Sequence, residues 1–96
     1  MVDHTQGNIL FDLYGPLLTR RQQDVLEFYF QDDLSLTEIQ ENLSISKAAV
    51  YDALKKGVQA MEELESILHL QAKLQVIQQF LQTHPEYSEE LGSLLE

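Results

Sequence analysis

Residues 35–54 read SLTEIQENLSISKAAVYDAL, and this stretch contains two helix starts separated by a tight turn. Ser35 precedes Glu38 by three residues, which is the spacing of a capping box, in which both side chains bond to backbone N–H groups at a helix N-terminus. Ser46 is a second helix-capping residue and follows a turn at residues 43–45. A short helix joined by three or four residues to another helix is the helix-turn-helix arrangement. The stretch therefore predicts a helix-turn-helix whose second helix starts after Ser46.

The helical period assigns an inner and an outer side to these two helices. The expected packing residues are Ile39, Leu43, Ile45, Val50 and Leu54. The outer stripe of the second helix is then Lys47, Tyr51 and Lys55, at positions i, i+4 and i+8, with Ala48, Asp52 and Lys56 beside it. In a helix-turn-helix, the outward side of the second helix faces the major groove of DNA.

A nucleic-acid role for this outer side has specific chemistry. The lysines would contact phosphates and Tyr51 a base or a sugar. Two residues weigh against strong direct readout: Ala48 has no hydrogen-bonding group and can only touch a thymine methyl group, and Asp52 would repel phosphates unless it accepts from a cytosine amino group. Arg20 and Arg21 fall in the first turn of an earlier predicted helix, where the helix dipole disfavours cations. Contact with an anion is one reason for that position, and solubility is another. The candidate nucleic-acid-binding residues are Arg20, Arg21, Ser46, Lys47, Ala48, Tyr51, Asp52, Lys55 and Lys56.

The alternative is that the lysines form an ordinary solvated face. The segment 35–60 contains three basic and three acidic residues and is neutral, whereas a DNA-binding protein that relies on salt-dependent attraction usually has a basic footprint. The whole chain carries 16 acidic and 6 basic side chains, a net charge of −10 at pH 7. Such a protein is repelled by a polyanion at long range. Charge alone does not separate the two interpretations.

The residues before Ser35 and the last residues of the chain also have helical patterns. Apolar spacing predicts a short helix over residues 8–14. Thr19 and Gln22 form a second capping box, which starts a helix that ends before Asp32. A short closing helix is expected over residues 85–95.

A long helix is expected in the second half of the chain. No proline occurs between Lys47 and Gln82, and a continuous helix over this segment would be roughly 54 Å long. Gly57 is a weak point for a bend, because glycine costs about 1 kcal/mol relative to alanine in a helix. A seam of apolar residues with spacings of 3 and 4 follows, namely Ile67, Leu70, Leu74, Ile77 and Leu81. This seam is either one face of a core helix or the contact with a second copy of the chain, a homodimer.

Length and composition exclude several classes of protein. Ninety-six residues are enough for one domain, with residues 8–64 as a helix-turn-helix bundle and residues 65–96 as a C-terminal helical extension. The chain has no cysteine, no apolar run long enough to span a membrane and no basic start of a signal peptide, so we expect a cytoplasmic protein. Phosphate-binding loops, nucleophile motifs and metal-ligand clusters are also absent from the sequence. We therefore expect no enzyme, no cofactor and no metal.

A familiar order of motifs runs through the chain: Leu17-Leu18-Thr19 with Gln22-Gln23, Glu27-Phe28-Tyr29, Asp32-Asp33-Leu34-Ser35-Leu36, Glu38-Ile39 and Ser46-Lys47-Ala48-Ala49-Val50-Tyr51-Asp52. This order resembles the YlxM family (UPF0122), over about residues 8–70. These are small bacterial proteins with a fold like region 4 of sigma factors, encoded beside the protein component of the signal recognition particle. The resemblance implies an all-α, sigma-region-4-like helix-turn-helix bundle with a long C-terminal helix.

The resemblance also implies a function. A member of this family would be a regulatory protein that takes part in the signal recognition particle pathway and binds nucleic acid, either DNA or the RNA of the particle. The alternative is a non-enzymatic adaptor that binds the signal recognition particle protein or its receptor through the acidic residues 57–96.

Overall fold

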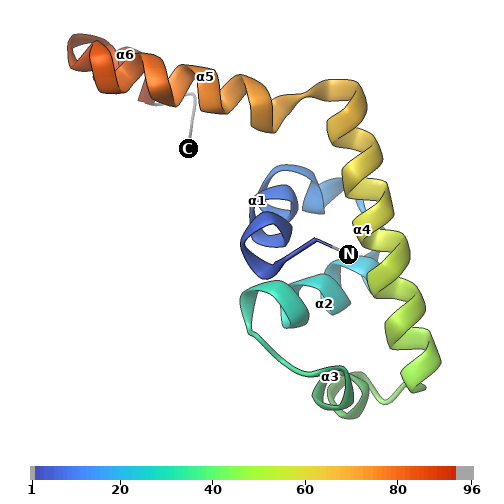
Figure 1. Cartoon of the computed structure of the whole chain (residues 1–96). Coiled ribbons are helices and arrows are strands. Elements are labelled where there is room, and N and C mark those ends of the chain that lie inside the picture. The colour runs from blue at the N-terminus through green and yellow to red at the C-terminus, as the bar shows by residue number, and fades with distance from the viewer. Residues whose placement is uncertain (1, 93–96) are drawn as a thin grey trace.

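The backbone of residues 2–92, the part of the chain that the computed structural model describes, is almost entirely helical and contains no strand (Figure 1). This confirms the predicted all-α class. The helices in chain order are α1 (His4–Tyr14), α2 (Arg20–Leu26), α3 (Leu36–Leu43), α4 (Lys47–Leu68), α5 (Leu70–Thr83) and α6 (Ser88–Gly92). Two 3-10 turns, Gly15–Leu17 and Pro85–Tyr87, precede α2 and α6, and α2 continues into a π-helical turn at Glu27–Gln31.

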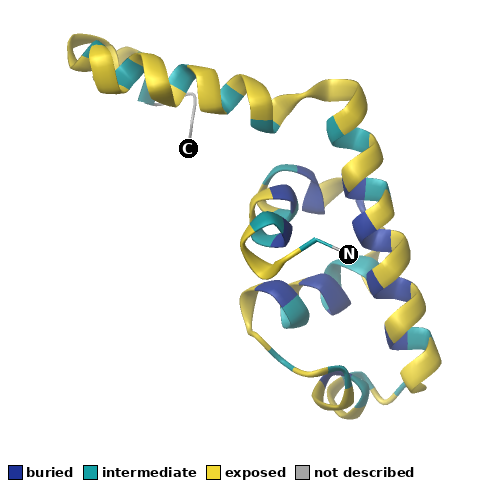
Figure 2. Cartoon of the chain, in the orientation of Figure 1, coloured by how far each residue is buried: buried dark blue, intermediate teal, exposed yellow. Residues whose placement is uncertain are grey.

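Helices α1, α2 and α3 pack along one side of α4 and enclose the core (Figure 1). Figure 2 shows that the buried segments of α1, α2 and α4 face one another, while the outer side of α4 is exposed. The core side chains come from all four helices and from the turns beside α2, and they are Leu10, Tyr14, Leu18, Val25, Leu26, Phe30, Ile39, Val50, Ala53, Leu54, Val58 and Met61. The apolar stripes read from the sequence thus become one continuous core.

Capping hydrogen bonds explain where the first four helices start. The Thr19 and Ser35 side chains each form the complete capping box that the sequence predicts. The Ser46 hydroxyl accepts from the Ala49 N–H at 3.0 Å. The first helix is longer than predicted: it starts at His4 rather than at residue 8, because the Asp3 carboxylate accepts from the Gln6 N–H at 2.8 Å and caps it.

The long helix is not continuous. No bend occurs at Gly57, where α4 is regular and the glycine is buried. A Cβ at Gly57 would lie 2.8 Å from Cδ1 of Leu26, so the glycine allows α2 to approach α4 closely. The break occurs at His69, whose backbone is left-handed with φ 55°. The predicted long helix is thus confirmed as α4, of 22 residues, but it ends at Leu68 rather than continuing to about Gln82.

Beyond His69, α5 forms an arm that leaves the bundle at a steep angle to α4 (Figure 1). The arm gives the chain its elongated outline of 51 × 25 × 20 Å. The predicted closing helix consists of the 3-10 turn Pro85–Tyr87 followed by α6, and both pack against α5. Leu94 and Leu95, which the sequence places in the closing helix, lie outside the described residues. No helix within residues 2–92 is both long and apolar enough to cross a membrane.

Candidate nucleic-acid interface

The turn between α3 and α4 has the geometry of a helix-turn-helix. Helix α3 ends at Ser44, which adopts a left-handed conformation with φ 54° and reverses the chain direction. Ser46 then caps α4. Ile39 and Val50 have no exposed surface and Leu54 has almost none, so they fix α4 against its neighbours. The amino-terminal half of α4 is consequently held rigidly in the bundle.

The opposite side of that half-helix is open to solvent. Lys47, Tyr51 and Lys55 are all exposed, and Tyr51 keeps 50% of its surface accessible. The orientation predicted from the helical period is therefore correct. Ser46, Ala48 and the other predicted contact residues of α4 are exposed as well. Their role in binding stays a prediction.

Ion pairs divide the basic side chains into two groups. Lys56 Nζ lies 3.3 Å from the Asp52 carboxylate, one turn earlier on α4. Because the Asp52 carboxylate is paired with Lys56 of the same helix, it repels a phosphate less strongly than an unpaired carboxylate would. Arg20 Nε lies 3.1 Å from the Asp24 carboxylate. Within residues 2–92, Lys47 and Lys55 have no such ion pair, so their charge remains available for an anion.

A shallow hollow of about 220 Å³ lies beside the exposed tyrosine. It is lined by Tyr51, Lys55, Val58, Gln59 and Glu62. An aromatic ring next to a cation and an amide is suited to a stacked base with a phosphate beside it. Glu62 lies at the carboxy-terminal end of the hollow and repels phosphates. The polarity of α4 therefore changes along its length, from a basic amino-terminal half to an acidic carboxy-terminal half.

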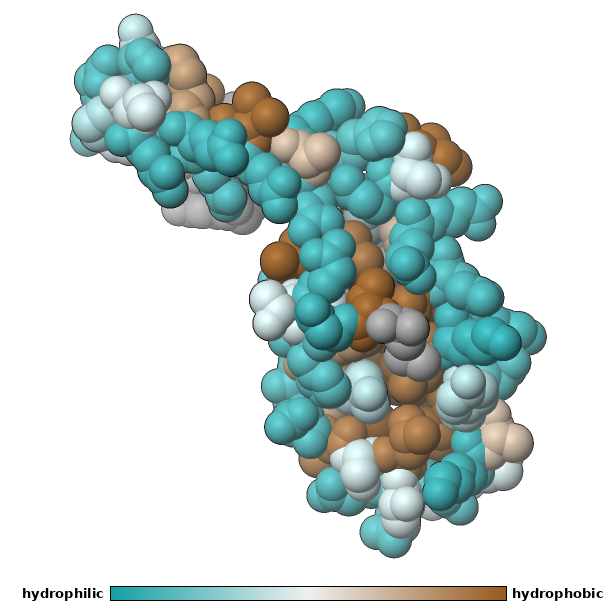
Figure 3. All heavy atoms as spheres, viewed as in Figure 1, coloured by the Kyte–Doolittle hydropathy of each residue, from teal (hydrophilic) through white to brown (hydrophobic). Residues whose placement is uncertain are grey.

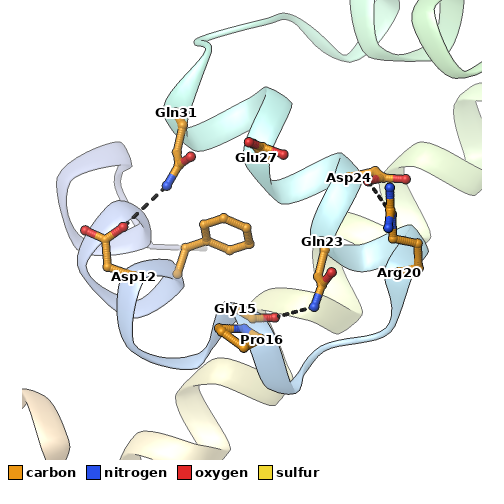
Figure 4. Close-up of a pocket in the computed structure, with 9 residues that line it drawn as sticks. Asp12, Gly15, Pro16, Arg20, Gln23, Asp24, Glu27 and Gln31 are labelled. Carbon is orange, nitrogen blue, oxygen red and sulfur yellow. Dashed lines mark hydrogen bonds and ion pairs between the residues drawn. The ribbon is translucent and has the colours of Figure 1, made fainter.

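Arg20 lines a different hollow from Tyr51 and Lys55. It lines a hollow of about 480 Å³ between α1 and α2, together with Asp12, Asp24 and Glu27. Figure 4 shows its guanidinium directed at Asp24, with the other carboxylates around the same opening. Arg20 thus shares this hollow with acidic groups, and none of the lysines of α4 lines it. Arg21 is exposed and does not line this hollow.

The helix-turn-helix geometry agrees with the comparison with known families. A family model described as "Putative helix-turn-helix protein, YlxM / p13 like" matches residues 1–91. The chain belongs to this family, UPF0122. The family resemblance read from the motifs is therefore confirmed.

Relatives of this UPF0122 chain occur in several bacteria. A UPF0122 protein of Limosilactobacillus reuteri strain DSM 20016 is 51% identical over 72% of this chain, and the match spans 61% of that relative's length. A relative from Halalkalibacterium halodurans is 42% identical and covers all of this chain and 94% of its own length. One from Streptococcus pneumoniae strain Hungary19A-6 is 37% identical over 82% of this chain and 76% of its own length.

The apolar seam of the arm is divided between two environments. Leu74, Ile77 and Leu81 are half-buried within the chain, whereas Ile67 is 65% and Leu70 is 37% exposed. Leu74 lines a hollow between α5 and α1. Figure 3 shows hydrophilic residues over most of the visible surface of the arm, with apolar patches between them. The half-buried residues agree with packing within the chain, and the exposed ones remain available for contact with a second copy. The pairing of two copies through the seam stays a prediction.

Two residues that the sequence patterns did not single out as a pair meet at the base of the arm. The Tyr14 hydroxyl, on a completely buried side chain, donates to Glu65 Oε1 at 2.6 Å. Burial, and then the hydrogen bond to Glu65, raise the pKa of Tyr14. Burial alone would raise the pKa of Glu65, but hydrogen bonds from Tyr14 and from two backbone N–H groups outweigh it, so the pKa lies below its ordinary value. The Glu65 carboxylate therefore stays ionised at neutral pH, and the nearby His69 also lowers its pKa.

Proposed function

We propose that this protein is a non-enzymatic regulatory protein that binds nucleic acid through the amino-terminal half of α4. The observation that carries the proposal is the position of Lys47, Tyr51 and Lys55, which are exposed on a helix whose other side is locked in the core by Val50 and Leu54. A rigidly held helix surface presents its side chains without a large loss of conformational entropy on binding.

The exposed side chains have distinct roles in this proposal. Lys47 and Lys55 neutralise phosphates, and Tyr51 stacks on a base or packs on a sugar. Lys56, which is paired with Asp52 at 3.3 Å, contributes less. With two free lysines at the centre of the interface, the affinity should depend on salt with a slope of roughly 0.9 per neutralised phosphate on B-DNA. The acidic carboxy-terminal half of the chain suppresses indiscriminate binding to other polyanions.

The resemblance to the YlxM family supports a place for this binding in the signal recognition particle pathway. In that setting, the ligand is either DNA or the RNA of the particle. The wide, shallow minor groove of an RNA helix and its loops present sugars and unstacked bases, which suit Tyr51. A B-DNA major groove admits the helix as a whole. We therefore propose both polymers as test ligands.

The decisive experiment compares two charge reversals that change the net charge equally. Lys55→Glu lies in the proposed interface, whereas Lys73→Glu lies in α5, on an exposed position of the arm. Retention of a labelled DNA duplex and of the particle RNA is measured in a salt titration. Lys55→Glu should weaken retention and lower the salt slope by about 1, while Lys73→Glu should leave the slope unchanged. Equal losses in both variants would contradict the interface and indicate a general effect of net charge.

A second candidate function is that of an adaptor that binds a basic protein. The family resemblance implies that this partner is the signal recognition particle protein or its receptor. The adaptor function is favoured by the exposed Glu62 and Glu63 of α4, which take part in no ion pair within residues 2–92. Replacing both by glutamine should then weaken capture of that protein from nuclease-treated lysate, with Lys55→Glu silent. Under the nucleic-acid proposal, nuclease treatment removes the partner and the glutamine variants are silent.

A further inference from the structure

The junction between α4 and α5 contains no residue that breaks a helix. Residues 63–73 read ELESILHLQAK, without glycine or proline. Nevertheless, His69 adopts φ 55°, a left-handed conformation that is unfavourable for a residue with a Cβ atom. Helix propensity alone does not favour a break at this point, so we look for its cause in contacts with the rest of the chain.

Those contacts replace the hydrogen bonds that the helix loses at the break. The Leu70 N–H donates to the Tyr14 hydroxyl at 3.3 Å. The Gln71 and Ala72 N–H groups donate to Oε1 and Oε2 of Glu65, at 2.9 and 3.4 Å. In a continuous helix, these three N–H groups would instead donate to carbonyls four residues earlier. The same three donors are thus satisfied in either conformation, by different acceptors.

The side chains of Gln6 and Gln71 add a second connection between the bundle and the arm. Each amide donates to the other, at 2.9 and 3.0 Å. Leu74 lies beside Ile9 and Leu13 of α1 in a hollow of about 260 Å³, so the arm covers this surface of α1 only partly. The attachment of the arm is therefore mainly polar, and it lies within its first turns.

From these observations we propose that the elbow at His69 is a two-state joint. In the bent state, Tyr14 and Glu65 form a latch that holds α5 at an angle to α4, as in Figure 1. In the straight state, the latch is open, His69 returns to helical geometry, and α4 and α5 merge into one helix. Straightening moves Leu74 away from α1 and increases the exposed surface of Ile9 and Leu13, of which Ile9 is already 38% exposed in the bent state. The joint is independent of the proposed function, because it lies at the end of α4 opposite to Lys47.

The chain has no cysteine, so the two states can be measured with pairs of introduced labels. Glu41→Cys on α3 and Gln79→Cys on α5 are both exposed, and their separation increases when the arm straightens. Pulsed electron spin resonance reports the distribution of distances between spin labels on this pair. A second pair, Glu41→Cys with Gln59→Cys on α4, monitors the bundle and should not change if it stays folded.

Two variants should favour the straight state and a third should favour the bent state. Tyr14→Phe and Glu65→Ala remove the latch, and should add a longer distance to the distribution or increase its share. His69→Gly removes the steric penalty of the left-handed conformation, and should raise the ratio of bent to straight molecules about fivefold or more. The matched controls are Tyr87→Phe and Glu63→Ala, which make the same chemical changes outside the latch and should leave the distribution unchanged.

Two distance distributions would overturn the proposal. If the wild type and both latch variants show only the short distance, the bend belongs to the α4–α5 segment itself and there is no second state. A wild type with only the long distance would also overturn it. Where Tyr14→Phe or Glu65→Ala disturbs the bundle pair, Glu65→Gln replaces it, since glutamine keeps the shape of the side chain but has one acceptor fewer.

Discussion

Gly7→Ala offers a quantitative test of how α1 packs against the π-helical turn. Gly7 is buried, and a Cβ at this position would lie 2.5 Å from Cζ of the Phe30 ring and nearer still to two other ring carbons. Ordinary contacts between carbon atoms are about 3.5–4.0 Å, so the ring would have to move by roughly 1 Å or more. Phe30 is 2% exposed and contacts the rings of His4 and Tyr29, which leave it little room.

The expected loss of stability follows from two opposing effects. Alanine has a higher helix propensity than glycine by about 1 kcal/mol. Overpacking a core costs about 1–3 kcal/mol, and the severe overlap with Phe30 puts this substitution at the upper end. The net destabilisation should be about 1–2 kcal/mol. In a protein of this size, each kcal/mol lowers Tm by roughly 4–8 °C.

Urea and thermal unfolding followed by circular dichroism measure this loss. Gly92→Ala is the matched control, because a Cβ at Gly92 meets nothing within 4 Å, and its stability should be equal to or slightly above that of the wild type. In a Phe30→Leu background, the smaller side chain should reduce the cost of Gly7→Ala. The packing argument fails if Gly7→Ala is as stable as the wild type, or if its cost is the same in both backgrounds.

Three further predictions concern the cap of α4, the latch and the seam. Ser46→Ala removes the cap of α4 and should cost about 1 kcal/mol in urea unfolding, whereas no loss would mean that another group caps the helix. The pKa of Glu65 is depressed in the folded state, so its stabilising contribution is present above the unfolded value of about 4.3 and is lost as pH falls through the folded value. Unfolding of the wild type should therefore be more sensitive to acid in that range than unfolding of Glu65→Gln, and identical pH profiles would refute this assignment. If Ile67 joins two copies, Ile67→Lys should convert a dimer into a monomer in sedimentation velocity, and a dimer that persists would exclude its participation.

The helix-turn-helix was predictable because its signals are local. The Ser35 and Ser46 caps act on backbone groups three residues away, so their hydrogen bonds can be read from spacing alone. The start of α1 follows the same rule through Asp3, and attention to that residue would have placed it correctly. The outward orientation of Tyr51 was predictable as well, since the inner residues of one helix determine its outer side.

The surroundings of Arg20 were not predictable in this way. Its proximity to Asp12 in one hollow depends on how α1 packs against the turns on either side of α2, and helical periodicity contains no information about the neighbour of a helix. Gly57 was considered as a site for a bend, whereas in the folded chain it is the contact point of α2 with α4. A glycine in a predicted helix is compatible with a bend or with a close contact to another helix, and only the position of the partner helix distinguishes the two.

The amino-acid sequence alone determines which segments are helical, where the first helices are capped and which side of each helix is apolar, because these properties arise from interactions within a few residues. The direction of the arm is decided only by the tertiary structure. A Tyr14 hydroxyl 51 residues away in the chain donates to Glu65 and accepts from the first N–H of α5. Such long-range hydrogen bonds give partners to N–H groups that the break at His69 leaves without helical acceptors, and residues 63–73 by themselves contain no sign of them.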